Sequence, residues 1–188
     1  MFEFEKKLLL TEEEYLCLKE STTAQPLLQI NHYFDTPDLT MYLHGVTYRI
    51  REKGGKFVAT IKEHRHGGYS VENSKEVKNQ WDTSHFGCRF LAYVGTLTTE
   101  RTVLFKDEYC EIVLDKNDYF GKTDYELEIE YRSDKKERAN ELLATIIEHI
   151  CKHFPESTPE SILGRCDQGN SKSHRFFERY LEGRCRPV

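Results

Sequence analysis

Residues 124–131 read Asp-Tyr-Glu-Leu-Glu-Ile-Glu-Tyr, and this strict alternation predicts a β-strand with two unlike faces. One face carries aromatic and aliphatic side chains, whereas the other carries Glu126, Glu128 and Glu130. Carboxylates in line on one face of a sheet repel one another. Taken alone, the strand is typical of a half-buried sheet that turns an acidic face to water.

Several other candidate strands also gather charged residues on one face, and the sign of the charge differs from strand to strand. The charged positions are Glu3, Glu5 and Lys7 in residues 2–10, Arg49 and Arg51 in 47–52, Lys62 in 56–63, Arg101 in 100–105 and Asp115 in 109–115. If the sheet closes into a barrel, these faces all point inward while the apolar faces pack outward against helices. Such an interior is stable only if it holds water and its charges compensate one another.

The two kinds of charge in this interior favour two kinds of ligand. Grouped carboxylates bind a hard divalent cation such as Mg²⁺ or Mn²⁺, which takes oxygen ligands and removes the repulsion. Grouped arginine and lysine side chains bind an anion with many oxygens, of which phosphate is the commonest. The sequence therefore predicts a combined metal and polyphosphate site.

The remaining pattern indicates an α+β fold. Further strands are expected at residues 30–34 and 69–77, whereas the mixed signal of residues 81–95 predicts helical turns. The expected helices follow the capping box Thr11–Glu14, cover residues 134–150 with apolar residues at three-and-four spacing, begin at Thr158-Pro159, and cover residues 171–181. No repeat, low-complexity tract or linker divides residues 1–188, so the pattern predicts one domain with a largely antiparallel sheet.

The composition excludes several classes of protein. Among the 188 residues, 27 are Lys or Arg and 32 are Asp or Glu, which gives a formal net charge of −5. This balance argues against bulk electrostatic binding to nucleic acid or to an anionic membrane. No apolar run reaches membrane-spanning length, and the first residues do not resemble a signal peptide. The six cysteines form no C-x-x-C pair, so we expect reduced thiols in a cytoplasmic protein.

A series of segments resembles the CYTH family, whose members are also called triphosphate tunnel metalloenzymes. Glu3-Phe-Glu5-Lys-Lys7 resembles the family's E-x-E-x-K signature, and Ser171-Lys172 with Arg175 resembles its S-K-x-x-R motif. Between them, in order, stand Tyr33-Phe-Asp-Thr-Pro (resembling Y-F-D-T-P), Tyr48-Arg-Ile-Arg51 (L-R-I-R), Thr60-Ile-Lys62 (T-x-K), Arg101 in a later basic strand, and Asp115 ahead of Glu126-Leu-Glu-Ile-Glu130 (E-L-E-I-E). The match runs from residue 3 to residue 175, and the length resembles that of single-domain bacterial members.

The resemblance implies an eight-stranded antiparallel β-barrel that forms a charged tunnel, with helices packed outside. It also implies a hydrolase that uses Mg²⁺ or Mn²⁺ to release phosphate from inorganic triphosphate, thiamine triphosphate or a nucleoside triphosphate by metal-activated water attack. Other branches of the family contain class IV adenylyl cyclases and the RNA triphosphatases of mRNA capping. A cyclase and a non-catalytic polyphosphate-binding module remain alternatives, because both would use the same charged groups. No adenine-specific pattern is present, which favours hydrolysis.

By resemblance, each charged position has an expected role. The metal ligands would be Glu3, Glu5, Asp115, Glu128 and Glu130, with Glu126 as a further candidate on the same face. The phosphate-binding residues would be Lys7, Arg49, Arg51, Lys62, Arg101 and Lys172. Other tunnel residues would be Glu72, or Glu76 if the register of residues 69–77 differs; Arg175, paired with an acid near the tunnel mouth; and Tyr33, which would orient the water or a leaving oxygen, or simply pack.

Four side chains also have simpler interpretations. Without the resemblance, Lys172 and Arg175 would be solvated bases on a helix. His149 and His153, spaced i and i+4, have no third metal ligand near them in the sequence and are interpreted as surface histidines.

Overall fold

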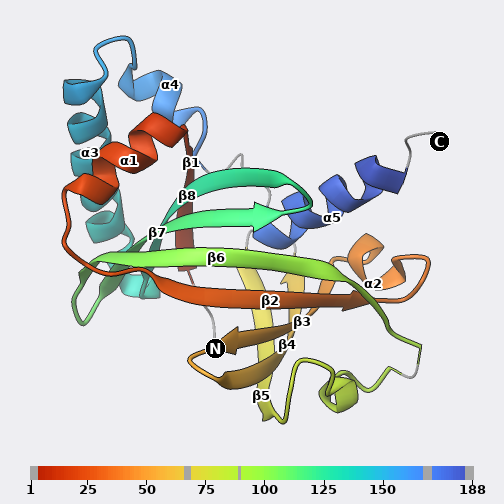
Figure 1. Ribbon diagram of the computed structural model, residues 1–188. Helices are drawn as coiled ribbons and strands as arrows, with labels where there is room; N and C mark the ends of the chain where they lie inside the picture. The colour runs from red at the N-terminus through yellow and green to blue at the C-terminus, as the bar shows by residue number, and fades with distance from the viewer. Residues whose placement is uncertain (1–3, 66–68, 89, 167–170, 185–188) are drawn as a thin grey trace.

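The computed structural model describes residues 4–65, 69–88, 90–166 and 171–184. Its strands are β1 (Phe4–Leu10), β2 (Leu27–Asp35), β3 (Val46–Lys53), β4 (Lys56–Arg65), β5 (Tyr69–Val77), β6 (Ala92–Lys106), β7 (Cys110–Tyr119) and β8 (Lys122–Tyr131). Its helices are α1 (Glu12–Glu20), α2 (Thr40–Leu43), α3 (Lys136–His153), α4 (Pro159–Leu163) and α5 (Lys172–Arg184), with 3₁₀ turns η1 (Thr83–Phe86) and η2 (Ser133–Lys135). Figure 1 shows their arrangement. Over these residues, no helix is long and apolar enough to cross a membrane.

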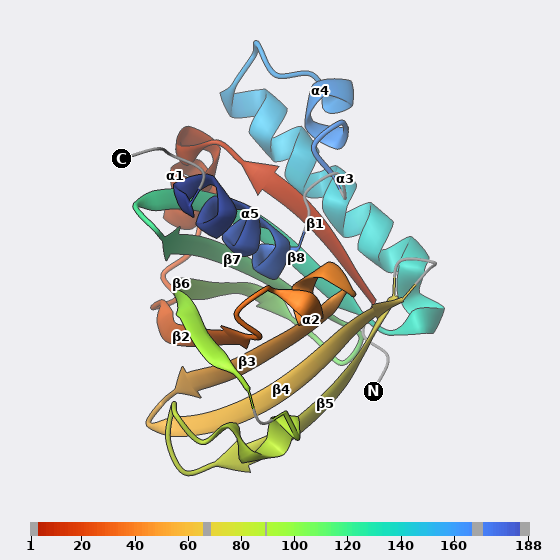
Figure 2. The ribbon, with the colours of Figure 1, turned by 90° about the vertical axis from the view of Figure 1, so that its right-hand side faces the viewer.

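All eight strands belong to one antiparallel sheet in the order β1-β8-β7-β6-β2-β3-β4-β5. Two meanders, β3-β4-β5 and β6-β7-β8, are joined through the pairing of β2 with β6. The sheet curls strongly into a half-barrel, as Figure 2 shows. The predicted α+β fold with a curled, eight-stranded antiparallel sheet and helices around it is therefore confirmed.

The convex face of β1, β7 and β8 is apolar and is covered by α1, α3 and α4 (Figure 1). The predicted strand 124–131 lies within β8, and its apolar residues Leu127 and Ile129 are fully buried against these helices. The capping box at Thr11 begins α1 as predicted. The buried face of α3 matches the predicted three-and-four spacing and consists of Ala139, Leu143, Ile147 and Ile150.

The convex face of β2, β3 and β4 is also apolar, and the turn η1 covers it. Phe86 in this turn stacks on Tyr48 with ring centroids 4.8 Å apart and packs near Phe34. Ile50 and Ala59 complete this second cluster and have no exposed surface. Both halves of the sheet therefore bury their apolar faces outward, which leaves the charged faces on the concave side.

The strand β6 is much longer than the predicted strand 100–105, since it runs from Ala92 to Lys106 over 15 residues. Its first half pairs along β2 and its second half along β7. The helical turns predicted for residues 81–95 are confined to η1, so that prediction is wrong from Ala92 onward. Position 95, inside the strand, is a glycine because a Cβ there would lie 2.6 Å from the Phe120 ring, too close for any side chain.

The last helix, α5, is not on the outside with the other long helices. Its residues Phe176 and Phe177 are fully buried against Tyr33, Leu97 and Tyr119, and Tyr33 lies on the concave face of the sheet. The helix therefore lies across one end of the half-barrel (Figure 2), and its first residues reach the charged interior.

Candidate active site

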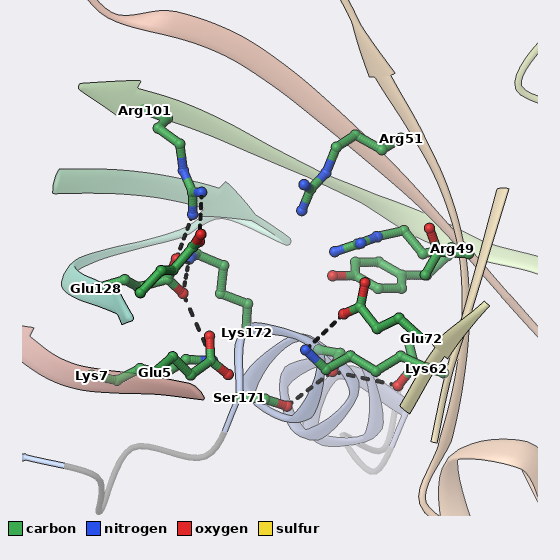
Figure 3. A pocket seen from close by; sticks show the side chains of 15 residues that line it. Glu5, Lys7, Arg49, Arg51, Lys62, Glu72, Arg101, Glu128, Ser171 and Lys172 are labelled. Carbon is green, nitrogen blue, oxygen red and sulfur yellow. Dashed lines mark hydrogen bonds and ion pairs between the residues drawn. The ribbon is translucent and has the colours of Figure 1, made fainter. Parts of the chain in front are cut away.

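The concave face encloses a cavity of about 230 Å³ whose lining is almost entirely charged or hydroxyl-bearing (Figure 3). Side chains from β1, β2, β3, β4, β5, β6, β8 and the start of α5 contribute to it. The predicted site residues that line the cavity are Glu5, Lys7, Tyr33, Arg49, Arg51, Lys62, Glu72, Arg101, Glu128, Glu130 and Lys172. Three others, Asp115, Glu126 and Arg175, are buried behind this lining, and Glu3 lies outside the described residues.

Strand register brings the acidic side chains together on one side, which we call the acidic wall: the carboxylates of Glu5, Asp115, Glu126, Glu128 and Glu130. Glu5 on β1 lies opposite Glu130 on β8. Asp115 on β7 lies opposite Glu126 on β8. Because alternate residues of a strand share a face, these pairings line up the acids of three adjacent strands.

Arg101 on β6 is bound to the acidic wall. Its Nε and Nη2 donate to Asp115 Oδ1 and Oδ2 at 2.9 and 2.7 Å, in a bidentate pair. The same guanidinium also donates to Glu128 and, at 3.4 Å, to Glu130. Burial disfavours its charge, but the bonds to Asp115 and the charges of Glu128 and Glu130 prevail and raise the pKa of Arg101.

Lys172, at the start of α5, inserts its ammonium among three buried acids. Its Nζ lies 2.7 Å from Asp115, 3.0 Å from Glu126 and 2.7 Å from Glu128. Burial opposes the charge, yet these carboxylates raise the pKa of Lys172 well above its ordinary value. Lys172 is therefore not a solvated helix base.

Glu128 is the centre of this network. Lys7 on β1 adds a further cation 3.7 Å from Glu128 and 2.9 Å from Glu5. Although burial acts in the other direction, Lys172, Lys7 and Arg101 hold the pKa of Glu128 well below its ordinary value. The carboxylate is therefore ionised at neutral pH, as a metal ligand must be.

Arg175 belongs to a second layer behind the cavity. Its guanidinium donates to Asp124 at 2.9 Å and to Glu126 at 3.0 Å. Asp124 also accepts from Tyr119 at 2.6 Å, and Arg175 is only 8% exposed. Like Lys172, Arg175 is thus no solvated base, and Glu126, which has no exposed surface, is held by these two residues rather than turned toward the cavity.

The opposite side of the cavity, the basic wall, consists of Arg49, Arg51 and Lys62 from β3 and β4 (Figure 3). Arg51 Nε donates to Asn31 Oδ1 at 2.9 Å, and the buried Arg49 Nε has no hydrogen-bond partner. In the described part of the chain, no carboxylate lies within ion-pair distance of either arginine. Burial is the largest cause that lowers the pKa of Arg51, and the positive charges of Arg49 and Arg101 lower it further, to about 10.

One acid accompanies the basic wall. Glu72 on β5 lies opposite Lys62 on β4 in the strand register. Its Oε1 forms an ion pair with Lys62 Nζ at 2.9 Å. Burial is outweighed by Lys62 and Arg49, which lower the pKa of Glu72. The alternative, Glu76, shares this face but lies opposite Val58, is exposed and does not line the cavity.

Tyr33 lines the cavity and also packs. Its ring centroid lies 4.5 Å from that of Phe176, and the residue is 2% exposed. The structure therefore shows the packing role directly, with one edge of the side chain facing the cavity.

Four hydroxyl residues of the lining were not assigned from the sequence: Thr47, Thr60, Ser171 and Ser173. Ser171 and Ser173 lie 2.9 Å apart through their Oγ atoms, and Thr47 donates to Ser173 at 3.4 Å. The alternation of β3 and β4 does contain a signal, because Thr47 precedes Arg49 by two residues and Thr60 precedes Lys62 by two. Ser171 belongs to the S-K-x-x-R segment, but strand alternation does not place either serine at the cavity, since their position depends on how α5 docks.

The acidic wall suits a hard divalent cation by the chemistry of its donors. Glu5, Glu128 and Glu130 present carboxylate oxygens to the cavity, and such oxygens are the ligands that Mg²⁺ and Mn²⁺ prefer. The side chains of Glu5 and Glu130 are 29% and 35% exposed, whereas that of Glu128 is 6% exposed. Among the described residues, no three carboxylates are close enough to share an ion without moving; Lys7, Arg101 and Lys172 are bonded to them instead.

Known proteins with similar sequences and structures agree with this architecture. Residues 1–150 match the family model for the CYTH domain. The "Putative triphosphatase YjbK" of Bacillus subtilis (strain 168) is 33% identical over 150 residues, which cover 68% of this chain and 76% of that protein.

Two solved structures share the fold over nearly the whole chain. One, described as a "putative adenylate cyclase" from Bacillus halodurans, has a TM-score of 0.68 and 27% identity, and the match covers 93% of this chain and 97% of that one. The other, a Hippeastrum protein named as a "putative adenylyl cyclase" and described as having a dominant triphosphatase activity, has a TM-score of 0.65 and 20% identity. That match covers 99% of this chain and 97% of the other. Since the family model covers most of the chain, the protein belongs to the CYTH domain family.

Proposed function

We propose that this protein hydrolyses a triphosphate, and that inorganic triphosphate is the substrate its cavity fits best. The observation that carries the proposal is the pair Arg49 and Arg51, whose guanidinium groups face the cavity without a carboxylate partner among the described residues. A buried charge is costly unless it is paired. An anion with several oxygens, such as a chain of phosphates, supplies partners for both groups.

The rest of the basic side of the cavity supports the same ligand. Lys62 adds a third positive charge, and Thr47 and Thr60 place hydroxyl donors two residues before Arg49 and Lys62 on the same faces. Glu72 neutralises only one of these charges. The basic wall therefore keeps an excess of positive charge for a phosphate chain.

Metal dependence rests on the acidic wall. Glu5, Glu128 and Glu130 would hold Mg²⁺ or Mn²⁺, a group that acts as a Lewis acid and lowers the pKa of a bound water. Asp115 is expected to act indirectly, because it orients Arg101 and Lys172 from behind the lining. Glu3 stays a predicted ligand.

The residues of the chain supply positioning and charge. Lys7, Arg101 and Lys172 stay protonated at neutral pH because the acidic wall raises the pKa of each. They lie beside the carboxylates and face the cavity, where they would stabilise the charge that develops on the phosphoryl oxygens. Phosphoryl transfer needs this kind of positioning and neutralisation more than covalent chemistry.

The character of the lining favours an inorganic substrate over a nucleotide. Sites for heterocyclic groups are lined mainly by apolar and aromatic side chains. Of the described residues that line this cavity, Tyr33 is the one aromatic, and it is packed against Phe176. The name of the Bacillus subtilis relative also supports a triphosphatase.

A class IV-type adenylyl cyclase is the second candidate, favoured by the description of the Bacillus halodurans structure at 27% identity. It would use the same phosphate and metal groups, so the two functions differ in their products. A cyclase converts ATP to cyclic AMP and pyrophosphate, whereas a hydrolase releases phosphate.

The test measures phosphate released from inorganic triphosphate, thiamine triphosphate and ATP with Mg²⁺ or Mn²⁺, with cyclic AMP assayed in parallel. We expect the fastest release from inorganic triphosphate. Glu128→Gln should abolish turnover while the fold survives. Glu76→Gln, which changes an exposed acid on the same face of β5 as Glu72, should leave turnover unchanged. Cyclic AMP as the main product would identify a cyclase, and tight triphosphate binding without turnover would identify a binding module.

A further inference from the structure

Outside the cavity, one cysteine and two histidines meet on the outer helices. Cys17 lies on α1, and His149 and His153 lie on the last turns of α3. The Cys17 Sγ is 3.8 Å from His149 Nε2, and the two imidazole rings have centroids 4.4 Å apart. One possible metal-ligand atom from each residue lies within 4.8 Å of the other two. Among the described residues, no other three His, Cys, Asp or Glu side chains meet this condition.

The fold explains why these residues meet. His149 and His153 are spaced i and i+4, so they lie on one face of α3. α1 packs beside α3, and its Tyr15 and Leu18 belong to the same buried apolar cluster as the apolar residues of α3. That packing turns Cys17 toward the histidines. The missing third ligand of the sequence analysis is thus supplied from 132 residues away.

The distances fit a tetrahedral metal centre. With metal–sulfur and metal–nitrogen bonds of about 2.3 and 2.05 Å, a sulfur and a nitrogen ligand of zinc lie about 3.6 Å apart. The observed distance between Cys17 Sγ and His149 Nε2 is 3.8 Å, so these two atoms are already near that spacing. Small rotations of the partly exposed rings would bring in the third ligand.

The hydrogen bonding of His153 also suits a ligand. Its Nδ1 lies 2.9 Å from the carbonyl oxygen of His149 and donates to it. A bond of this kind fixes the tautomer and leaves Nε2 with a lone pair, as is usual for histidines that bind metals. His153 is exposed and the other two residues are partly exposed, which leaves a side open for a water or other fourth ligand.

We propose that Cys17, His149 and His153 form a binding site for a borderline-soft divalent cation such as Zn²⁺, which joins α1 to α3. On binding, the Cys17 thiol loses its proton to solvent and the thiolate and two neutral imidazoles coordinate the ion. A thiolate and two imidazoles do not suit Mg²⁺ or Mn²⁺, which prefer oxygen ligands. The site is therefore chemically separate from the acidic wall of the cavity.

The test uses Co²⁺ as a spectroscopic substitute for Zn²⁺, added to the full-length, chelator-treated protein in excess Mg²⁺. We expect one equivalent of Co²⁺ to produce a thiolate-to-cobalt charge-transfer band that Zn²⁺ then removes. Cys17→Ser should abolish this band, and His149→Ala should weaken Co²⁺ binding by at least about tenfold. Cys151→Ser is the matched control. Cys151 is a partly buried thiol on α3, the helix of the two histidines, but it does not belong to the group of three ligands.

A second measurement detects the link between the helices. Zn²⁺ should raise the melting temperature of the wild type and of Cys151→Ser but not that of Cys17→Ser. Melting the same variants without metal shows whether each is folded. A Co²⁺ spectrum without a thiolate band, or a band that persists in Cys17→Ser, would overturn the proposal.

Discussion

Replacing Arg51 with methionine should stabilise the ligand-free protein slightly while it weakens triphosphate binding. Burial and the nearby arginines lower the pKa of Arg51 to about 10, from an ordinary value of 12.5. At about 1.4 kcal/mol per pKa unit, keeping this guanidinium charged in the folded state costs on the order of 3 kcal/mol. Methionine fills a similar volume and carries no charge, so the variant avoids that cost.

Part of this gain is lost at Asn31. Its Oδ1 accepts the 2.9 Å hydrogen bond from Arg51, and the residue is 2% exposed. Leaving a buried acceptor without a partner costs about 1–3 kcal/mol, so the net gain in free energy of unfolding should lie between zero and about 2 kcal/mol. Loss of a charge-assisted bond to phosphate, worth about 1.5–3 kcal/mol, should raise the KM for inorganic triphosphate by about tenfold to a hundredfold.

The assay is urea unfolding in phosphate-free buffer with a chelator, followed by steady-state kinetics. Arg51→Lys keeps the charge and should show no gain in stability, and Arg138→Met, on the exposed side of α3, should change neither quantity. Destabilisation of Arg51→Met by more than about 2 kcal/mol, as expected for a well-paired buried charge, would refute the reasoning. So would an unchanged KM.

Three further outcomes are expected. Lys172→Met leaves its three buried acids without their shared cation and should lower the free energy of unfolding by about 3–5 kcal/mol, measured by urea titration. Burial raises the pKa of Glu14, but Arg165 and Thr11 outweigh it and hold this pKa below its ordinary value of 4.5. The ionised Glu14 therefore stabilises the fold above that pH, and this stabilisation is lost as the pH falls through the lowered pKa. Unfolding of Glu14→Gln should therefore resemble the wild type in acid and be weaker by about 1–2 kcal/mol near neutral pH; a constant difference at all pH values would contradict this. Chelation should stop phosphate release, and added Mg²⁺ or Mn²⁺ should restore it; undiminished release would rule out metal dependence.

Much of the site was predictable because it depends on strand alternation. A residue's face follows from its position along the strand, so Glu128, Arg51 and Lys62 were placed on the inner face before their partners were known. The outer core followed in the same way, because a face with apolar residues must be covered by the amphipathic helices. Long strands with weak apolar character were less predictable, as the first half of β6 shows.

What could not be predicted depends on contacts between distant segments. The sequence did not indicate that Glu126 is sealed behind the cavity, because its burial requires Arg175 and Lys172 of α5 to dock at the end of the half-barrel. Likewise, four of the six expected phosphate-binding bases, Lys7, Lys62, Arg101 and Lys172, are bonded to acids. The meeting of Cys17 with His149 also required two packed helices.

The place of α5 has a consequence for how the protein matures. The ribosome releases the sheet before α5, and until α5 emerges the acids behind the cavity lack two of their cations, Lys172 and Arg175. A nascent chain that stops before this helix carries repelling carboxylates in a loosely held interior. The charged interior is therefore completed when α5 docks and its two cations neutralise that repulsion.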